Sequence, residues 1–98
     1  MIRHLALFTV VEEKQADKSA LIAEAAERLA PLVGVVPGLH SIEVHTDELG
    51  EGNFDFAIIA TMDDIAAVKV YQTHPAHVEA ASFIGTFRGE RAVVDYHF

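Results

Sequence analysis

IRHLALFTVV, residues 2–11, is a run of β-branched, aliphatic and aromatic residues that ends at two glutamates. Such a run predicts a β-strand, in which successive side chains face opposite sides. One parity holds His4, Ala6, Phe8 and Val10, and the other holds Arg3, Leu5, Leu7, Thr9 and Val11. Both faces of this strand are therefore largely apolar, whereas an antiparallel sheet with one solvated face alternates apolar and polar residues.

The rest of the chain predicts six further helices and strands around this strand. We expect a loop over 12–17, a helix over 20–34, a strand over 39–47, a turn over 48–53, a strand over 54–62, two short helical segments over 65–71 and 75–87, and a last strand over 90–98. The order is β-α-β-β-α-β, which is the ferredoxin-like α+β arrangement of an antiparallel sheet with helices on one face. Residues 1–98 form one domain.

The second face of the predicted sheet has no helix to cover it. The later strands repeat the pattern of the first, with apolar residues on both parities of 54–62 and 90–98. A second copy of the chain is the simplest cover, because an extended apolar surface marks an interaction site. We therefore expect a homodimer that packs sheet against sheet.

Composition excludes several classes of partner and chemistry. The chain has no cysteine, which removes thiolate chemistry and is typical of a cytoplasmic protein, and 51% of its residues are hydrophobic. The net charge of −8 disfavours nucleic acid and anionic membranes as partners. No apolar run approaches the roughly 20 residues that span a bilayer. The first residues look like a strand rather than a signal peptide.

Four short motifs, taken together, resemble a known family. They are HLALF at 4–8, VPG at 36–38, YxxHPxH at 71–77 and VDY at 94–96. In this order they are similar to the stress-responsive A/B barrel domain, also called the dimeric α/β barrel. The resemblance implies a ferredoxin-like subunit whose four-stranded antiparallel sheet closes into a barrel with the sheet of a second subunit.

The resemblance also implies a chemistry, through a distant similarity to the family's polyketide cyclase, olivetolic acid cyclase. That enzyme closes a linear polyketide by an aldol condensation without a cofactor. By motif, its catalytic histidine and tyrosine fall on His77 and Tyr71, and a supporting histidine falls on His4. A further pocket histidine falls on Phe56, so this chain departs from that pattern and lacks one polar group of that pocket, which argues against the same substrate.

The histidines of YQTHPAH, residues 71–77, admit more than one interpretation. Pro75 suits the first turn of a helix, which places His74 near the N-cap and His77 one turn on. A metal site needs at least three ligands and this spacing supplies two, so we predict no metal. His77 could move a proton while the Tyr71 hydroxyl holds a carbonyl oxygen. Alternatively, His74 caps the helix and His77 is a hydrogen-bonded core residue.

His4 and Asp95 are polar residues within apolar strands. An unpaired buried polar group costs about 1–3 kcal/mol, so each needs a partner. A hydrogen bond between them across neighbouring strands would satisfy both, either as a structural pair or with Asp95 orienting a pocket histidine.

Three hypotheses for function remain open, and they leave open whether the protein is an enzyme. The first is a binder of a small apolar or aromatic ligand, or a cyclase-like enzyme, with its pocket between sheet and helices. Its candidate residues are His77 and Tyr71 for catalysis and His4, Phe8, Phe56, Ile58, His74 and Asp95 for ligand contact. The second is a non-catalytic, stress-protective dimer. The third, from fold analogy, is a cofactor-independent monooxygenase. A void that reaches His77 and Tyr71 would favour the first.

Overall fold

Four strands form a single antiparallel sheet in the order β2-β3-β1-β4. The computed structural model describes residues 1–98. The strands are β1 (Ile2–Val10), β2 (Leu39–Thr46), β3 (Phe56–Met62) and β4 (Arg88–His97). The helices are α1 (Lys18–Leu29), α2 (Ile65–Thr73) and α3 (Pro75–Gly85), with 3-10 segments η1 (Glu12–Asp17) and η2 (Ala30–Leu32). The predicted ferredoxin-like α+β fold is confirmed, with its second helical region divided into α2 and α3.

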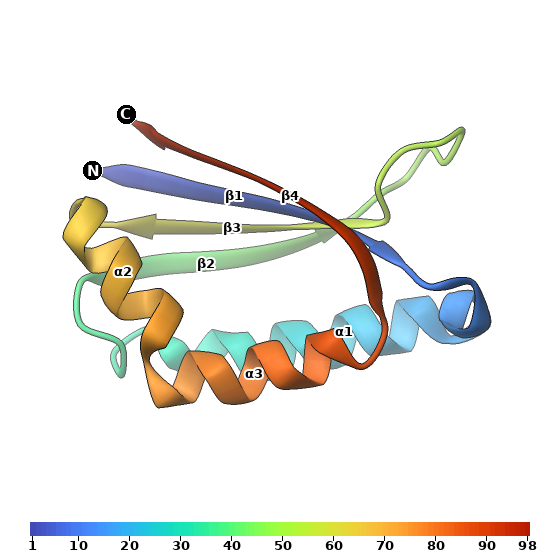
Figure 1. Ribbon diagram of the computed structural model, residues 1–98, viewed down its shortest axis with the longest axis horizontal. Helices are drawn as coiled ribbons and strands as arrows, with labels where there is room; N and C mark the ends of the chain where they lie inside the picture. Colours follow the sequence, from blue (N-terminus) through green and yellow to red (C-terminus); the bar gives the residue numbers. More distant parts are fainter.

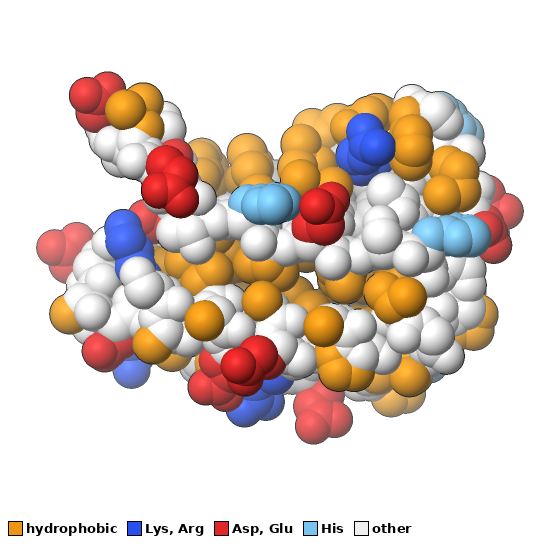
Figure 2. Space-filling model, turned by 180° about the vertical axis from the view of Figure 1, so that it is seen from behind, with side chains coloured by type: hydrophobic (Ala, Val, Ile, Leu, Met, Phe, Trp, Pro, Cys, Tyr) orange, Lys and Arg blue, Asp and Glu red, His pale blue; other side chains and the backbone are white.

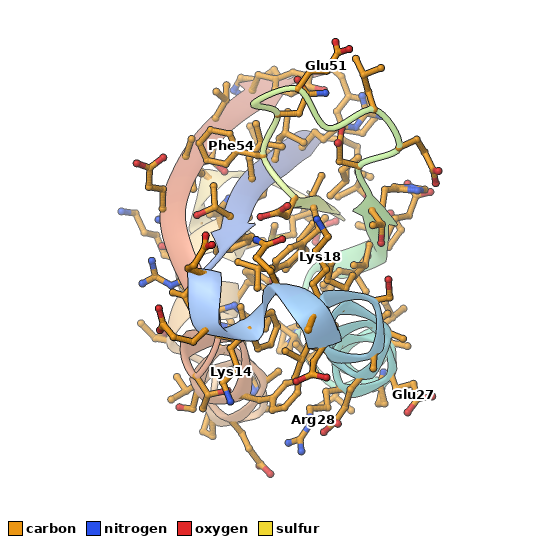
Figure 3. The ribbon with its side chains drawn as sticks, turned by 90° about the vertical axis from the view of Figure 1, so that its right-hand side faces the viewer. Lys14, Lys18, Glu27, Arg28, Glu51 and Phe54 are labelled. Atoms are coloured by element: carbon orange, nitrogen blue, oxygen red, sulfur yellow. The ribbon has the colours of Figure 1, made fainter.

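The sheet and the helices form two layers with the core between them (Figure 1). Along β1 and β3, buried and half-buried residues alternate strictly, and the buried parity faces the helices. This parity contains His4, which shares it with Ala6, Phe8 and Val10. Figure 3 shows the layers end-on, with Glu27 and Arg28 on the outer side of the helices and Phe54 above the sheet. None of the helices is long and apolar enough to cross a bilayer.

The outer face of the sheet is apolar and uncovered, as the sequence predicts. Leu5 of β1 pairs with Ile59 of β3 and Val94 of β4, and Val94 is 58% exposed. Hydrophobic side chains stand along this upper side of the molecule in Figure 2. Polar residues lie at the β2 edge, where Glu43 and His45 have the same orientation, and at one end of the face, where Arg3 pairs with Thr61. The apolar surface thus spans three of the four strands.

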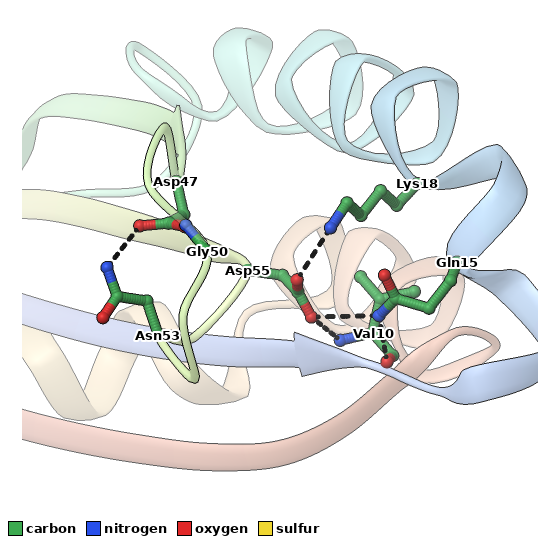
Figure 4. Close-up of polar contacts among 7 residues, drawn as sticks. All are labelled: Val10, Gln15, Lys18, Asp47, Gly50, Asn53 and Asp55. Atoms are coloured by element: carbon green, nitrogen blue, oxygen red, sulfur yellow. Dashed lines mark hydrogen bonds and ion pairs between the residues drawn. The ribbon is translucent and has the colours of Figure 1, made fainter.

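Several segments differ from the expectations. The helix predicted over 20–34 ends at Leu29 and is followed by the 3-10 segment η2, and the last strand begins at Arg88 rather than at residue 90. Residues 12–17 form η1 rather than a loop, and Phe54 lies before β3 rather than within it. The η1 segment lies beside Asp55, whose carboxylate accepts hydrogen bonds from the Val10 amide at 2.7 Å, from Gln15 at 3.3 Å and from Lys18 at 3.1 Å (Figure 4). This contact joins the end of β1, the 3-10 segment and the start of α1 to the residue before β3.

The chain breaks between α2 and α3 at His74, as expected for the residue before a proline. His74 has an extended backbone, and its Nδ1 accepts a hydrogen bond from the Ala76 amide at 3.1 Å. Asp64 caps α2 in the same way through the Ala67 amide at 2.8 Å. The break changes the direction of the chain, so that Tyr71 at the end of α2 and His77 at the start of α3 meet over the sheet.

Candidate ligand pocket

A cavity of about 200 Å³ lies between the sheet and the helices. Its wall is mainly apolar and includes three side chains that carry ring nitrogens or a phenol. The lining residues are His4, Ala6, Phe8, Leu29, Ile58, Tyr71, Gln72, His77, Ala81, Ile84, Gly85, Arg88 and Arg91. They come from all the layers of the fold: β1 and β3 supply the floor, the helices supply the roof, and β4 supplies one side.

Tyr71 is the centre of a row of three rings. Its ring centroid lies 4.2 Å from that of His77 and 5.8 Å from that of His4. Tyr71 is almost wholly buried, whereas His77 is half-buried at the wall of the cavity. Two of these rings are on helices and one is on β1, so the fold brings together residues that are more than 65 positions apart, as in His4 and Tyr71.

Hydrogen bonds fix which ring nitrogen of each histidine carries a proton. His77 Nδ1 lies 3.3 Å from the Gln72 carbonyl, and His4 Nδ1 lies 2.5 Å from the Asp95 carboxylate. Both partners only accept, so Nδ1 is the donor in each ring and Nε2 of the neutral ring keeps its lone pair. The expected hydrogen bond between His4 and Asp95 is thus confirmed.

The Tyr71 hydroxyl and the two Nε2 atoms make no hydrogen bond within the chain. No enclosed side-chain nitrogen or oxygen is left without a partner. These three polar atoms must therefore be reached from the cavity that their side chains line. A few unpaired polar groups converging on an apolar cavity are typical of a small-molecule site.

Burial sets the protonation states of the two central groups. It raises the pKa of the Tyr71 phenol to about 12, although the charge of Arg91 acts in the opposite direction. Burial also lowers the pKa of His77 below its usual 6.5, while the hydrogen bond to Gln72 acts to raise it. At neutral pH the site therefore presents a neutral imidazole, which can accept a proton, beside a protonated phenol, which can donate a hydrogen bond.

Five of the eight candidate residues line the cavity, and three do not. Those that line it are His4, Phe8, Ile58, Tyr71 and His77. Phe56 is buried beneath the cavity, where it stacks on Phe8 with ring centroids 5.0 Å apart. His74 caps α3, and Asp95 contacts His4 rather than the cavity. Phe56, His74 and Asp95 therefore do not line this cavity.

The sequence interpretation missed the polar residues Gln72, Arg88 and Arg91. A signal for Arg91 was present, because it has the same strand parity as Asp95, which was expected to form a hydrogen bond with His4. Arg88 gave no such signal, since it lies before the predicted strand. No group of three or more histidine, aspartate or glutamate side chains is arranged to hold a metal ion.

Comparison with known proteins places the chain in a family. The model of the stress responsive A/B barrel domain matches residues 2–98. A dimeric ferredoxin-like protein of unknown function from Bacteroides fragilis is 26% identical, with 99% of this chain and 95% of that chain covered and a TM-score of 0.90. A second, from Thermobifida fusca, is 30% identical, with 99% and 90% covered and a TM-score of 0.83.

A hydroxynitrile lyase from Passiflora edulis has the same fold, at 20% identity, with 97% of this chain and 90% of that chain covered and a TM-score of 0.72. The comparison with curated proteins finds no match. The match to the family model spans nearly every residue. The chain belongs to the stress responsive A/B barrel domain family.

Proposed function

We propose that the protein is a homodimer that binds a small apolar or aromatic molecule in the cavity and performs acid–base chemistry on it with His77 and Tyr71. The observation that carries this proposal is the contact of the two rings, 4.2 Å apart, at one cavity wall. A neutral imidazole and a protonated phenol side by side are the groups that enolisation of a carbonyl compound requires.

The size of the cavity supports a ligand with one aromatic or ring-forming portion. An apolar cavity of about 150 Å³ is large enough to take up benzene in another protein. The cavity here is about 200 Å³ and adds polar groups from Tyr71 and His77 to such an apolar wall. A packed interior, as a purely protective dimer would require, would leave no such space.

The proposed reaction is a cyclase-like aldol condensation. His77 Nε2 takes a proton from the carbon next to a carbonyl, and the Tyr71 hydroxyl donates a hydrogen bond to the oxygen of the resulting enolate. The enolate carbon forms a bond to a second carbonyl carbon of the same molecule, and the π electrons of that carbonyl move to its oxygen. The protonated His77 then returns the proton to this alkoxide, which leaves a hydroxyl group and the neutral imidazole. No external oxidant, reductant or metal is consumed.

The dimer is proposed on two grounds. The outer sheet face carries apolar side chains such as Leu5 and Val94 with nothing to cover them, and the relatives from Bacteroides fragilis and Thermobifida fusca are described as dimeric. Sedimentation at micromolar concentration tests it: the wild type should have twice the mass of the chain, and Leu5→Glu should have the mass of one chain. A wild type that stays monomeric would refute the dimer.

The chemistry is tested with linear β-polyketide thioesters and detection of cyclised product by mass spectrometry. Wild-type protein should form ring product, and His77→Ala and Tyr71→Phe should each reduce the rate at least about 100-fold, the usual contribution of a general acid or base. His45→Ala is the matched control, because His45 is an exposed histidine on β2. Equal rates for wild type and His77→Ala would remove His77 from catalysis.

A further inference from the structure

Two arginines of β4 lie on the same side of the sheet because the strand contains a bulge. Arg91 pairs with Phe8, and Arg88 pairs with Val10, so an interval of two residues on β1 faces an interval of three on β4. In a regular strand, residues three apart point to opposite faces. The additional residue brings both arginines to the inner side, where both line the cavity.

The bulge is held by specific contacts of the neighbouring residues. The Glu90 amide donates a hydrogen bond to Thr9 Oγ1 at 2.7 Å. At Gly89 a Cβ atom would lie only 2.7 Å from the same Oγ1, so the approach of the two strands requires glycine at this position. The sequence Gly89-Glu90 opposite Thr9 therefore builds the bulge, which positions Arg88 and Arg91 together.

The two guanidinium groups are free of carboxylate partners, although acidic residues predominate in the chain. The chain has 15 acidic and 7 basic residues, yet none of the acidic ones lines the cavity. Lys18 and Arg28 are paired with Asp55 and Glu24, whereas Arg88 and Arg91 form no ion pair. Both arginines are exposed, so they are open to solvent as well as to the cavity.

We propose that Arg88 and Arg91 form an anion-binding rim, and that the ligand of the cavity is an apolar or aromatic carboxylic acid. Its hydrophobic portion lies against Phe8, Ile58 and Tyr71, and its carboxylate lies at the rim. Guanidinium groups hold carboxylates through paired N–H donors in a plane, which gives both charge and geometry. This inference rests on the proposed function of the cavity as a ligand site, and it specifies the charge of the ligand.

The test compares benzoate with benzamide, which has the same ring and shape but no charge. Binding is measured by NMR titration at low ionic strength, with the ring signals of Tyr71 and His77 reporting occupation of the cavity. Wild-type protein should bind benzoate at least about tenfold more tightly than benzamide, and added salt should reduce the difference, because it screens charge.

Substitutions of the two arginines test whether the rim causes the preference for benzoate over benzamide. Arg88→Gln and Arg91→Gln should each weaken benzoate binding several-fold, and the double variant should bind benzoate and benzamide equally, with benzamide affinity unchanged in all of them. Lys69→Gln is the control, because Lys69 is an exposed cation on α2 that does not line the cavity. It should leave both affinities unchanged.

The outcomes distinguish failure of the anion-binding rim from failure of the cavity as a ligand site. If benzamide binds as tightly as benzoate, or if the double variant keeps the preference, the anion-binding rim is refuted while the cavity remains a ligand site. If neither probe shifts the signals of Tyr71 and His77 at millimolar concentration, both the rim and the proposed ligand site are refuted.

Discussion

His4 and Asp95 lie at directly paired positions of β1 and β4, with Nδ1 of the imidazole 2.5 Å from the carboxylate oxygen. The imidazole is buried beside Tyr71, whereas the carboxylate is 31% exposed at the edge of the sheet. Asp95 therefore acts on the pocket through His4: it fixes the orientation of the ring and directs Nε2 towards the cavity.

Loss of the Asp95 carboxylate should destabilise the protein. Asp95→Ala leaves the buried donor of His4 without its partner, so we expect the free energy of unfolding to fall by about 1–3 kcal/mol. Denaturant unfolding of wild type, Asp95→Ala, His4→Phe and the double variant measures the coupling between the two residues, which should be at least about 0.5 kcal/mol. Additive effects would show that the two side chains do not stabilise each other.

The pKa of His77 should be below 6.5, because burial disfavours the imidazolium form. Between this lowered value and 6.5, the unfolded chain binds more protons than the folded one. The contribution of His77 to stability is therefore complete above pH 6.5. It is lost as the pH falls from 6.5 through the lowered pKa of the folded state. NMR titration of the imidazole ring gives the pKa, and the signal is assigned by its absence in His77→Gln. The same variant should lose the part of the pH dependence of unfolding that His77 contributes. A midpoint above 6.5 would contradict the burial argument.

The two histidines of the helix break should have separable roles. His74→Ala removes the cap on the Ala76 amide and should cost about 1 kcal/mol of unfolding free energy, with little effect on ligand affinity. His77→Ala should weaken ligand binding or turnover with a smaller effect on stability. Thermal unfolding and ligand titration of both variants test the distinction. Equal loss of ligand affinity in the two variants would argue that His74 also contacts the ligand.

Asp55 should be a determinant of acid stability. Burial tends to raise the pKa of Asp55, but the hydrogen bonds from the Val10 amide, Lys18 and Gln15 outweigh it, and the pKa is lowered. A lowered carboxyl pKa stabilises the fold above the unfolded value of 3.8 and loses this effect as the pH falls below it. Asp55→Ala should therefore cost about 1.5–3 kcal/mol at pH 7 and progressively less below pH 3.8.

Asp17→Ala is the matched control for Asp55, because the exposed Asp17 side chain makes no capping hydrogen bond. It should change the free energy of unfolding by no more than about 0.5 kcal/mol at either pH. A loss for Asp55→Ala that is equal at pH 7 and at pH 3 would show that packing, rather than the charge, explains the effect.

Gly38 should tolerate substitution less well than Gly34. Both have positive φ, +81° and +92°, which costs a residue with a Cβ about 1–2 kcal/mol. At Gly38 the new Cβ would also lie 2.9 Å from the Ala67 Cβ of α2, whereas at Gly34 nothing lies within 4 Å. Gly38→Ala should therefore lower the melting temperature more than Gly34→Ala, as measured by thermal unfolding. Equal shifts would show that α2 moves aside without cost.

Sequence periodicity predicts the fold where side chains alternate strongly. Residues 2–11 predicted a strand with His4 on the same face as Ala6 and Phe8, but because both faces are apolar they did not show which face meets the helices, and Pro75 predicted the break between the helical segments. Residues 12–17 carry no apolar periodicity, so their 3-10 conformation was missed. It depends on local bonds, such as that of the Lys14 amide to the Val11 carbonyl at 3.0 Å, and on the distant Asp55.

The sequence predicted which candidate residues lie on the inner face of the sheet, but not which of them line the cavity. Parity correctly placed Phe56 on the inner side, but it could not say that this ring packs beside Phe8 without lining the cavity. Counting along the strand would put Arg88 and Arg91 on opposite faces, since they are three residues apart. Only the pairing of β4 with β1 reveals the extra residue, because the contact with Thr9 depends on how the two strands align.

The bulge in β4 has a consequence for how this chain can vary. Deletion of Glu90 would make the strand regular and would turn either Arg88 or the segment from Arg91 onward over to the opposite face. In the first case a positive charge would enter the apolar surface proposed to join two subunits, and in the second Asp95 would leave His4. Loss of this one residue would therefore alter either the proposed subunit interface or the contact that orients His4.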